Sequence, residues 1–191
     1  MVKNLLVVAI ALASFSTFAK VETVEVDTAA SKLSYTGKKV TGQHSGEVKI
    51  AKGSLSFEKG ALKGGEIEVD MTTISNTDIG DAEYMKKFIG HITSEDFFDT
   101  AKFKTASLKV KSVKKGKAAD TYSVTADLTI KGKTAPVTFD ATATKEKAAA
   151  KLTFDRTKYD VKYNSGKFFQ GLGDKLIYDD VELEVNLALK K

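Results

Sequence analysis

Apolar and polar residues alternate along most of the chain beyond residue 20, which is the pattern of a strand with one buried face. In the segment 65–71, Ile67, Val69 and Met71 alternate with acidic side chains. The same period of two recurs in the segments 121–130, 136–144, 148–154 and 177–189. The pattern predicts a mainly β protein with an antiparallel sheet, because parallel strands are usually apolar on both faces.

Turn signals separate the alternating segments and predict hairpins between them. They include the pairs Lys59-Gly60 and Gly64-Gly65 and the triplets Lys115-Gly116-Lys117 and Lys131-Gly132-Lys133. The single proline, Pro136, stands at the start of a segment, where its missing N–H costs the sheet least. No linker, repeat or low-complexity tract divides the chain. We therefore expect one domain whose sheet closes on itself as a barrel.

One segment departs from this alternation and predicts a helical insertion near residues 80–98. Its apolar residues recur at intervals of three and four, which is helical spacing, at Tyr84, Met85, Phe88, Ile89 and Ile92. Gly90 interrupts the spacing, and Thr93 to Asp96 has the composition of a helix start. We expect a helix near 80–90 and a short helical turn near 94–98.

The first nineteen residues predict a secretory signal peptide. Lys3 is followed by an apolar run from Leu5 to Ala13 and by small residues that end at Ala19. Cleavage there leaves a domain of residues 20–191 in the periplasm or outside the cell. The chain has no cysteine, so we expect packing and strand pairing to hold it without disulfides.

Charge and composition argue against several classes of function. The formal net charge is +5, but the lysines are scattered along the strands and Arg156 is the only arginine, which argues against a nucleic-acid partner. His44 stands where a nucleophile elbow would carry serine, and its separation from His91 is unlike that of metal ligands. The sequence predicts no enzyme, no metal and no organic cofactor.

The expected barrel interior is either filled by side chains or holds one apolar ligand. Its inward positions mix the bulky Phe57, Phe139 and Phe154 with many alanines, which leave room. The adjacent Phe97 and Phe98 end the helical insertion. In one interpretation both pin the helix to the sheet; in the other, one of the two rings faces the interior.

Arg156 and the aromatic residues after it have two interpretations each. If Arg156 points inward it must pair with an acid, for which Asp155 is a candidate; at the barrel mouth it could bind a phosphate. His91 could contact a head group or bond a backbone carbonyl. Core packing is the alternative role for Tyr159, Tyr163, Phe168 and Phe169.

Three segments resemble motifs of one known family. The run from His91 to Asp99, HITSEDFFD, resembles the H-L-x-S-x-D-F-F-D signature of the YceI-like family, and Lys102-Phe103 continue it. The run from Leu128 to Thr134, LTIKGKT, is similar to its L-T-I-x-G-x-T segment, and Phe154 to Thr157 looks like its late arginine-containing region. The resemblance covers the chain beyond residue 20 in order.

The resemblance implies a fold and a ligand but no catalytic activity. The implied fold is an extended, lipocalin-like, antiparallel barrel of eight strands with helices between two of them. The implied ligand is a long apolar chain inside the barrel, such as a polyisoprenoid or a fatty-acid derivative. An exported carrier of this kind would serve transport, storage or stress protection.

These arguments select the candidate site residues. We expect an apolar tunnel lined by Phe57, Ile67, Val69, Met71, Phe88, Ile89, Phe97, Phe98, Phe103, Phe139, Phe154, Phe168 and Phe169, and head-group contacts from His91, Arg156, Tyr159 and Tyr163. A transient membrane contact and a homodimer are open alternatives. The competing function is a barrel with a packed interior that acts through its surface, in stress response or through interactions.

Overall fold

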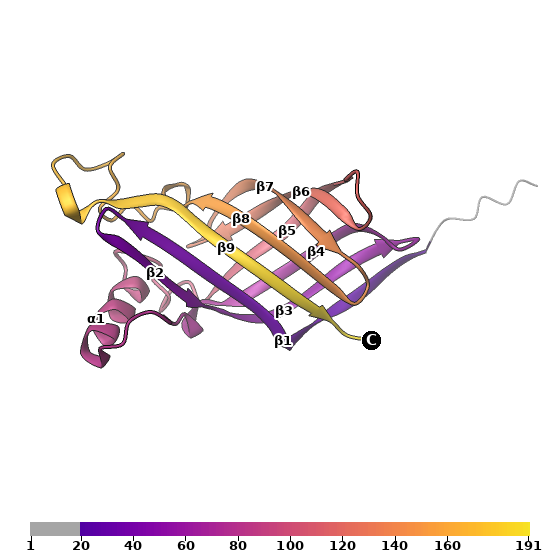
Figure 1. The fold of residues 1–191 in the computed structure, drawn as a ribbon, viewed down its shortest axis with the longest axis horizontal. Helices are drawn as coiled ribbons and strands as arrows, with labels where there is room; N and C mark the ends of the chain where they lie inside the picture. The colour runs from indigo at the N-terminus through magenta and orange to yellow at the C-terminus, as the bar shows by residue number, and fades with distance from the viewer. Residues whose placement is uncertain (1–19) are drawn as a thin grey trace, which may run out of the picture.

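The computed structural model describes residues 20–191, which form a closed antiparallel barrel (Figure 1). The expected signal peptide lies outside this range. The strands are β1 (Val21–Lys39), β2 (Gly42–Glu47), β3 (Lys49–Glu58), β4 (Ala61–Asp70), β5 (Thr105–Lys115), β6 (Thr121–Ile130), β7 (Lys133–Ala143), β8 (Lys147–Asp155) and β9 (Ile177–Leu189). β1 pairs with both β2 and β3, each strand from β3 to β8 pairs with the next, and β1 closes the barrel by pairing with β9.

The nine strands make an eight-stranded barrel, because β2 and β3 occupy one position in it. The C-terminal part of β1 pairs with β2 and its N-terminal part with β3, on the side of β1 opposite to β9. Only Val48 separates the two short strands, and its N–H donates to the carbonyl of Leu33 in β1 at 3.1 Å. The expected fold class is confirmed.

The alternation read from the sequence corresponds to the two faces of the barrel wall. In β6, Tyr122, Val124, Ala126, Leu128 and Ile130 are all buried and face inward. The intervening residues are more exposed. Burial of one face in each strand supplies the apolar core that stabilises a barrel without disulfides.

Two of the predicted turns are tight two-residue hairpins. Lys59 and Gly60 both have positive φ, as do Lys131 and Gly132. Two positive φ values define the type I′ turn, whose twist matches that of the strands it joins. These turns fix the register of β3 with β4 and of β6 with β7.

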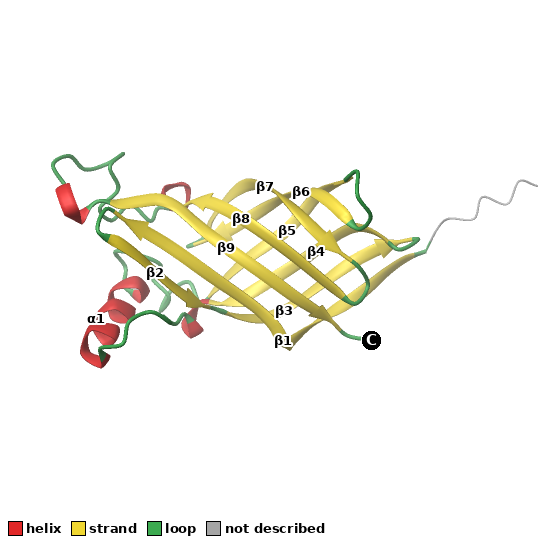
Figure 2. Cartoon of the chain, viewed as in Figure 1, coloured by secondary structure: helices red, strands yellow, loops and turns green. Residues whose placement is uncertain are grey.

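The two ends of the barrel differ in their connections (Figure 2). At one end, called the hairpin end, short turns join the strands. At the other, called the cap end, two long connections leave the barrel: residues 71–104 between β4 and β5, and residues 156–176 between β8 and β9. The first contains α1 (Ala82–Thr93) and the 3₁₀ turn η1 (Met71–Thr73); the second contains η2 (Arg156–Tyr159) and η3 (Gly173–Lys175).

The helical insertion differs in detail from the expectation. Helix α1 begins after Asp81, whose carboxylate accepts the N–H of Tyr84 at 2.7 Å, and runs through Gly90 to Thr93. Gly90 therefore does not interrupt it, because an exposed glycine costs a helix only about 1 kcal/mol. Residues 94–98 form hydrogen-bonded turns instead of a second helix start. Within residues 20–191, no helix is long and apolar enough to cross a membrane.

The sheet is incomplete between β7 and β8. Their ladder consists of Ala141–Ala150, Thr142–Ala149 and Ala143–Ala148, whereas β8 pairs with β9 along its whole length. Toward the cap end, β7 and β8 form no further pairs with each other. The hydrogen-bonded hairpin pair Ile130–Lys133 sets the alternation along β7, so the backbone of Pro136 faces this unpaired edge. Its missing N–H therefore costs the sheet nothing.

Candidate functional site

An apolar cavity of about 170 Å³ lies inside the barrel. Thirty residues from the barrel strands and the first connection border it, and none of them is charged. Tyr35 and Ser107 are its only polar side chains. An apolar cavity of this size stays dry and takes apolar guests.

The inward alanines make this cavity possible. Ala141 and Ala143 of β7 lie beside Ala148 and Ala150 of β8, and all four border the cavity. Larger side chains at these positions would fill the space between the two strands. The expectation that small inward residues leave room in the interior corresponds to this wall.

Six of the proposed tunnel residues border the cavity. They are Ile67, Val69, Met71, Phe98, Phe139 and Phe154. Sequence reasoning missed Leu33, Tyr35, Leu108 and Val110, which also border it. Their alternation with polar residues in the segments 33–35 and 108–110 could have identified them.

Seven proposed tunnel residues lie elsewhere. Phe57 is buried but does not border the cavity. Phe88, Ile89, Phe97 and Phe103 belong to the packing of the first connection, where Phe88 lies 4.6 Å from the ring of His44 and Phe103 lies against Gly132. Phe168 and Phe169 are 49% and 50% exposed, because their turn projects from the barrel.

The adjacent rings of Phe97 and Phe98 have separate roles. Phe98, from the first connection, borders the cavity. Phe97 packs on the other side against His91 and Tyr163, with ring centroids 5.6 and 6.2 Å away. One ring closes the cavity and the other anchors the first connection to the second.

Arg156 is buried, and each of the three nitrogens of its guanidinium donates a hydrogen bond within the protein. Its guanidinium donates to the carbonyls of Tyr178, Val161 and Ile177 at 3.2, 2.9 and 3.0 Å. Its ionic partner is Asp179, at 3.3 Å, and not Asp155 as expected. Burial lowers the pKa of Arg156, and the two carboxylates offset part of that effect.

Asp179 is the one inward position of β9 that breaks the apolar face, and Arg156 accounts for it. Lys167 contacts the other oxygen of Asp179 at 3.3 Å and donates to Asp155 at 2.7 Å. These two acids and two bases, called the Arg156 cluster, join β8 and β9 to the second connection. The cluster holds the cap end of the barrel together.

The remaining head-group candidates lie around the Arg156 cluster. Tyr159 is fully buried, its hydroxyl has no hydrogen-bond partner, and burial together with Asp155 raises its pKa to about 12. The rings of His91 and Tyr163 are 4.4 Å apart, and Tyr163 is 36% exposed. The fold thus brings all four candidates to the cap end, but as a packed aromatic cluster.

The part of the first connection that precedes α1 is hydrogen-bonded to β2. Asp78 contacts Nδ1 of His44 at 2.9 Å and accepts the N–H of Ser45 at 2.9 Å. Although slight burial raises the pKa of Asp78, these hydrogen bonds lower it below its usual range. The first connection passes close to Gly46, since a Cβ there would lie 1.8 Å from the carbonyl oxygen of Ser75.

In residues 20–191, no cluster of three or more potential metal-ligating side chains occurs.

Comparison with known sequences identifies one family. A model of the YceI-like domain matches residues 25–189. A UPF0312 protein of Pseudomonas fluorescens strain Pf-5 is 41% identical over 101 residues, which are 51% of this chain and 48% of the relative. Protein YceI of Escherichia coli O157:H7 is 35% identical over 96 residues, 50% of this chain and 47% of that protein. The aligned regions thus span about half the length of these curated relatives.

Solved structures show the same fold. BcnA of Burkholderia cenocepacia superposes with a TM-score of 0.68 at 22% identity, covering 87% of this chain and 99% of that one. A polyisoprenoid-binding domain of Saccharophagus degradans superposes with a TM-score of 0.59 at 14% identity, covering 87% and 97%. At these identities, the likeness concerns the barrel and not its ligand.

Proposed function

The chain belongs to the YceI-like family, and on that premise we propose that it is an exported lipid-binding protein that holds a long apolar chain inside its barrel. The carrying observation is the cavity, whose thirty bordering residues include no charge. A polyisoprenoid-binding domain with the same fold supports an isoprenoid or related amphiphile as the ligand. The role would be transport, storage or stress protection in the periplasm.

The energetics favour an apolar chain over a polar ligand. Each CH₂ moved from water into an apolar site contributes about 0.8 kcal/mol, so ten buried carbons contribute roughly 8 kcal/mol before ordering costs. An engineered cavity of about 150 Å³ holds one benzene, so the present volume suits a short segment of chain. A longer ligand requires the strands of the barrel wall to separate, and β7 and β8 offer the least resistance because their ladder is incomplete.

Head-group recognition is part of this proposal. His91 and Tyr163 are the candidates at the edge of the aromatic cluster, while the donors of Arg156 are already engaged. Nothing in the site favours catalysis, so we propose a binding role. The homodimer stays a prediction.

Extraction of the purified protein tests the proposal. Protein from the exported fraction should release a long-chain lipid in stoichiometric amount, detected by mass spectrometry, while an unrelated exported protein should not. Ala150→Leu, which fills the cavity, should lower the bound amount, and Ala101→Leu, at an exposed position, should not. An empty, well-folded protein would favour the packed barrel that acts through its surface.

A further inference from the structure

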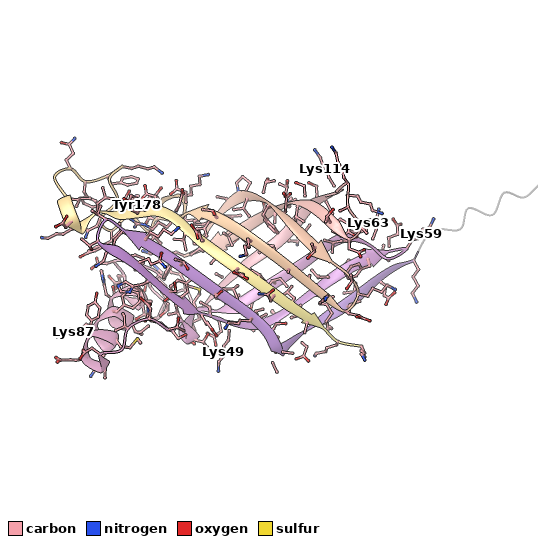
Figure 3. The ribbon with its side chains drawn as sticks, in the orientation of Figure 1. Lys49, Lys59, Lys63, Lys87, Lys114 and Tyr178 are labelled. Carbon is pink, nitrogen blue, oxygen red and sulfur yellow. The ribbon has the colours of Figure 1, made fainter. Side chains whose placement is uncertain are left out.

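The exposed apolar residues of the described chain gather at the cap end. Exposed large apolar or aromatic residues are Val21, Val40, Tyr84, Tyr163, Phe168, Phe169 and Tyr178. All except Val21 belong to cap-end segments, and Figure 3 shows Tyr178 there, with Lys59, Lys63 and Lys114 at the opposite end. Such concentration of exposed apolar side chains marks an interaction surface.

Phe168 and Phe169 are adjacent exposed rings of this surface, and a hydrogen-bonded turn holds them there. The N–H groups of both residues donate to the carbonyl of Ser165, which is fully buried. Lys167, immediately before them, is tied to Asp155 and Asp179. The turn is therefore already ordered before it meets a partner, with both rings exposed to water. Binding then costs less conformational entropy, which favours association.

The charges around this turn fit an anionic lipid surface. Outside the Arg156 cluster, which takes up Lys167, the second connection carries three lysines and two aspartates, an excess of one positive charge (3 − 2). Lys162 lies 5.1 Å from the ring centre of Phe168. Aromatic rings flanked by lysines combine insertion at the bilayer interface with attraction to anionic head groups.

We propose that the turn Phe168-Phe169 docks the cap end of the barrel on an anionic membrane surface. The two rings enter the interface, and Lys158, Lys162 and Lys175 of the second connection contact the head groups. This docking goes beyond ligand binding, and its test does not depend on what the cavity holds.

Tryptophan reporters test the docking directly, because the chain has no tryptophan of its own. Phe169→Trp places a reporter on the docking turn, and Val21→Trp places a matched one at an exposed position of the other end. With vesicles of phosphatidylcholine and phosphatidylglycerol, brominated acyl chains should quench the first reporter only. Salt or omission of phosphatidylglycerol should weaken the effect. Equal quenching of both reporters, or of neither, would overturn the proposal.

A double variant provides the second measurement. Phe168→Ser with Phe169→Ser should reduce co-sedimentation with the same vesicles roughly tenfold or more, because two aromatic side chains no longer enter the interface. Its urea unfolding should match that of the wild type. Unchanged co-sedimentation of the folded variant would exclude the turn as the docking element.

A different observation concerns how an apolar chain reaches the cavity. A groove of about 590 Å³ lies on the outer surface beside the fork where the β7–β8 ladder ends. Four residues border both the groove and the cavity: Ala141, Ala149, Ala150 and Val185. The wall between inside and outside is thus thinnest where the sheet loses its hydrogen bonds.

We infer that an apolar chain enters the cavity through this fork between β7 and β8. The small side chains of Ala141, Ala149 and Ala150 lie at the base of the fork, and the strands beyond Asp140 and Lys151 can separate without breaking ladder hydrogen bonds. Entry here rests on the proposed lipid-binding function. It also lets a chain longer than the cavity extend into the groove.

A reversible lock tests this entry route, since the wild type has no cysteine. Asp140→Cys with Lys151→Cys would join the strands one residue beyond the last recorded pair. The control lock is Thr125→Cys with Thr138→Cys, whose hydroxyls are 3.2 Å apart across the complete β6–β7 ladder. Loss of free thiols reports closure of each lock.

The probe is cis-parinaric acid, a fluorescent long-chain fatty acid, and the readout is its rate of uptake. The oxidised fork lock should slow uptake about tenfold, and reduction should restore it; the control lock should leave the rate unchanged. Ala149→Trp, which obstructs the wall from outside, should also slow uptake. Unchanged rates in both variants would overturn the entry route alone, whereas no uptake by the wild type would overturn the lipid-binding function with it.

Discussion

The two pairs of adjacent phenylalanines occupy opposite environments at the same end of the barrel. Phe97 packs near Arg156, whose guanidinium carbon lies 5.7 Å from its ring centre, and Phe98 borders the cavity. Phe168 and Phe169 are about half exposed, at 49% and 50%. Both pairs follow short polar turns and neither has a regular period. Identical dipeptides thus serve as core and as surface, depending on the elements that face them.

The neighbours of each pair explain the difference. Phe97 lies against Tyr163 of the second connection and Phe98 borders the cavity, so both rings meet other side chains. The turn before Phe168 and Phe169 is itself the outermost layer, anchored from below by Ser165 and Lys167. Substitutions that remove the contacts of one pair at a time should therefore change the stability of the two regions by different amounts.

The largest effect should follow from removing the cation beside Phe97. Arg156→Ala leaves Asp179, whose side chain is 14% exposed, with Lys167 alone as ionic partner, and it leaves three carbonyls without their donor. Loss of one member of a buried ion pair typically costs about 3–5 kcal/mol. Urea unfolding should show that decrease, and Lys158→Ala, at an exposed neighbouring position, should not. A decrease below about 1 kcal/mol would mean that Lys167 alone can hold Asp179.

The next effect separates the two pairs themselves. Phe98→Ala should lower the free energy of unfolding by about 3 kcal/mol, because it enlarges the cavity and removes buried contacts. Phe168→Ala should change it by less than about 0.5 kcal/mol. Thermal and urea unfolding of both variants measure the contrast. Similar costs at the two positions would contradict the placement of the second pair.

A smaller effect should come from the helix that precedes the first pair. Asp81→Ala removes the side-chain acceptor for the N–H of Tyr84 at the start of α1. Loss of such a cap costs about 1 kcal/mol. Hydrogen exchange should quicken in α1 and stay unchanged around Phe168. Equal quickening in both regions would show that the two connections unfold together.

The smallest expected change in stability comes from Asp155, which binds Lys167 beneath the second pair and responds to acid pH. Partial burial raises the pKa of Asp155, but hydrogen bonds from Lys167 and Thr157 outweigh it, and the net pKa is lowered. Because the pKa of Asp155 is lower in the folded protein than in the unfolded chain, its ionised carboxylate stabilises the fold at pH values above the unfolded pKa of about 4. This stabilisation disappears as the pH falls through the pKa of the folded state. Wild type should therefore exceed Asp155→Asn in stability at neutral pH.

The comparison across pH supplies the control for that prediction. The difference between wild type and Asp155→Asn in urea unfolding should narrow as the pH falls below about 4. Asp174→Asn, at an exposed position of the same connection, should show no such convergence. A constant difference at all pH values would mean that the carboxylate charge contributes nothing.

The cavity-lining residues that lie on strands could be predicted from the alternation of apolar and polar residues. Ile67, Val69, Met71, Phe139 and Phe154 were expected in the interior and border the cavity. The loop aromatics were not predictable in this way, since a loop has no period that assigns a side chain to a face. Phe88, Phe103 and Phe168 are examples, and each has a different neighbour in the structure.

Local sequence patterns were enough to predict β4, β6, β7, β8 and β9, the hairpins that follow β3 and β6, and the antiparallel barrel class. These depend on local properties: the alternation of side chains along a strand and the positive φ tolerated at Lys59-Gly60 and Lys131-Gly132. The folded structure was needed to show that Arg156 pairs with Asp179, that one of two adjacent rings closes the cavity, and that the β7–β8 ladder stops early. Those outcomes depend on contacts between segments far apart in the chain, which no local pattern encodes.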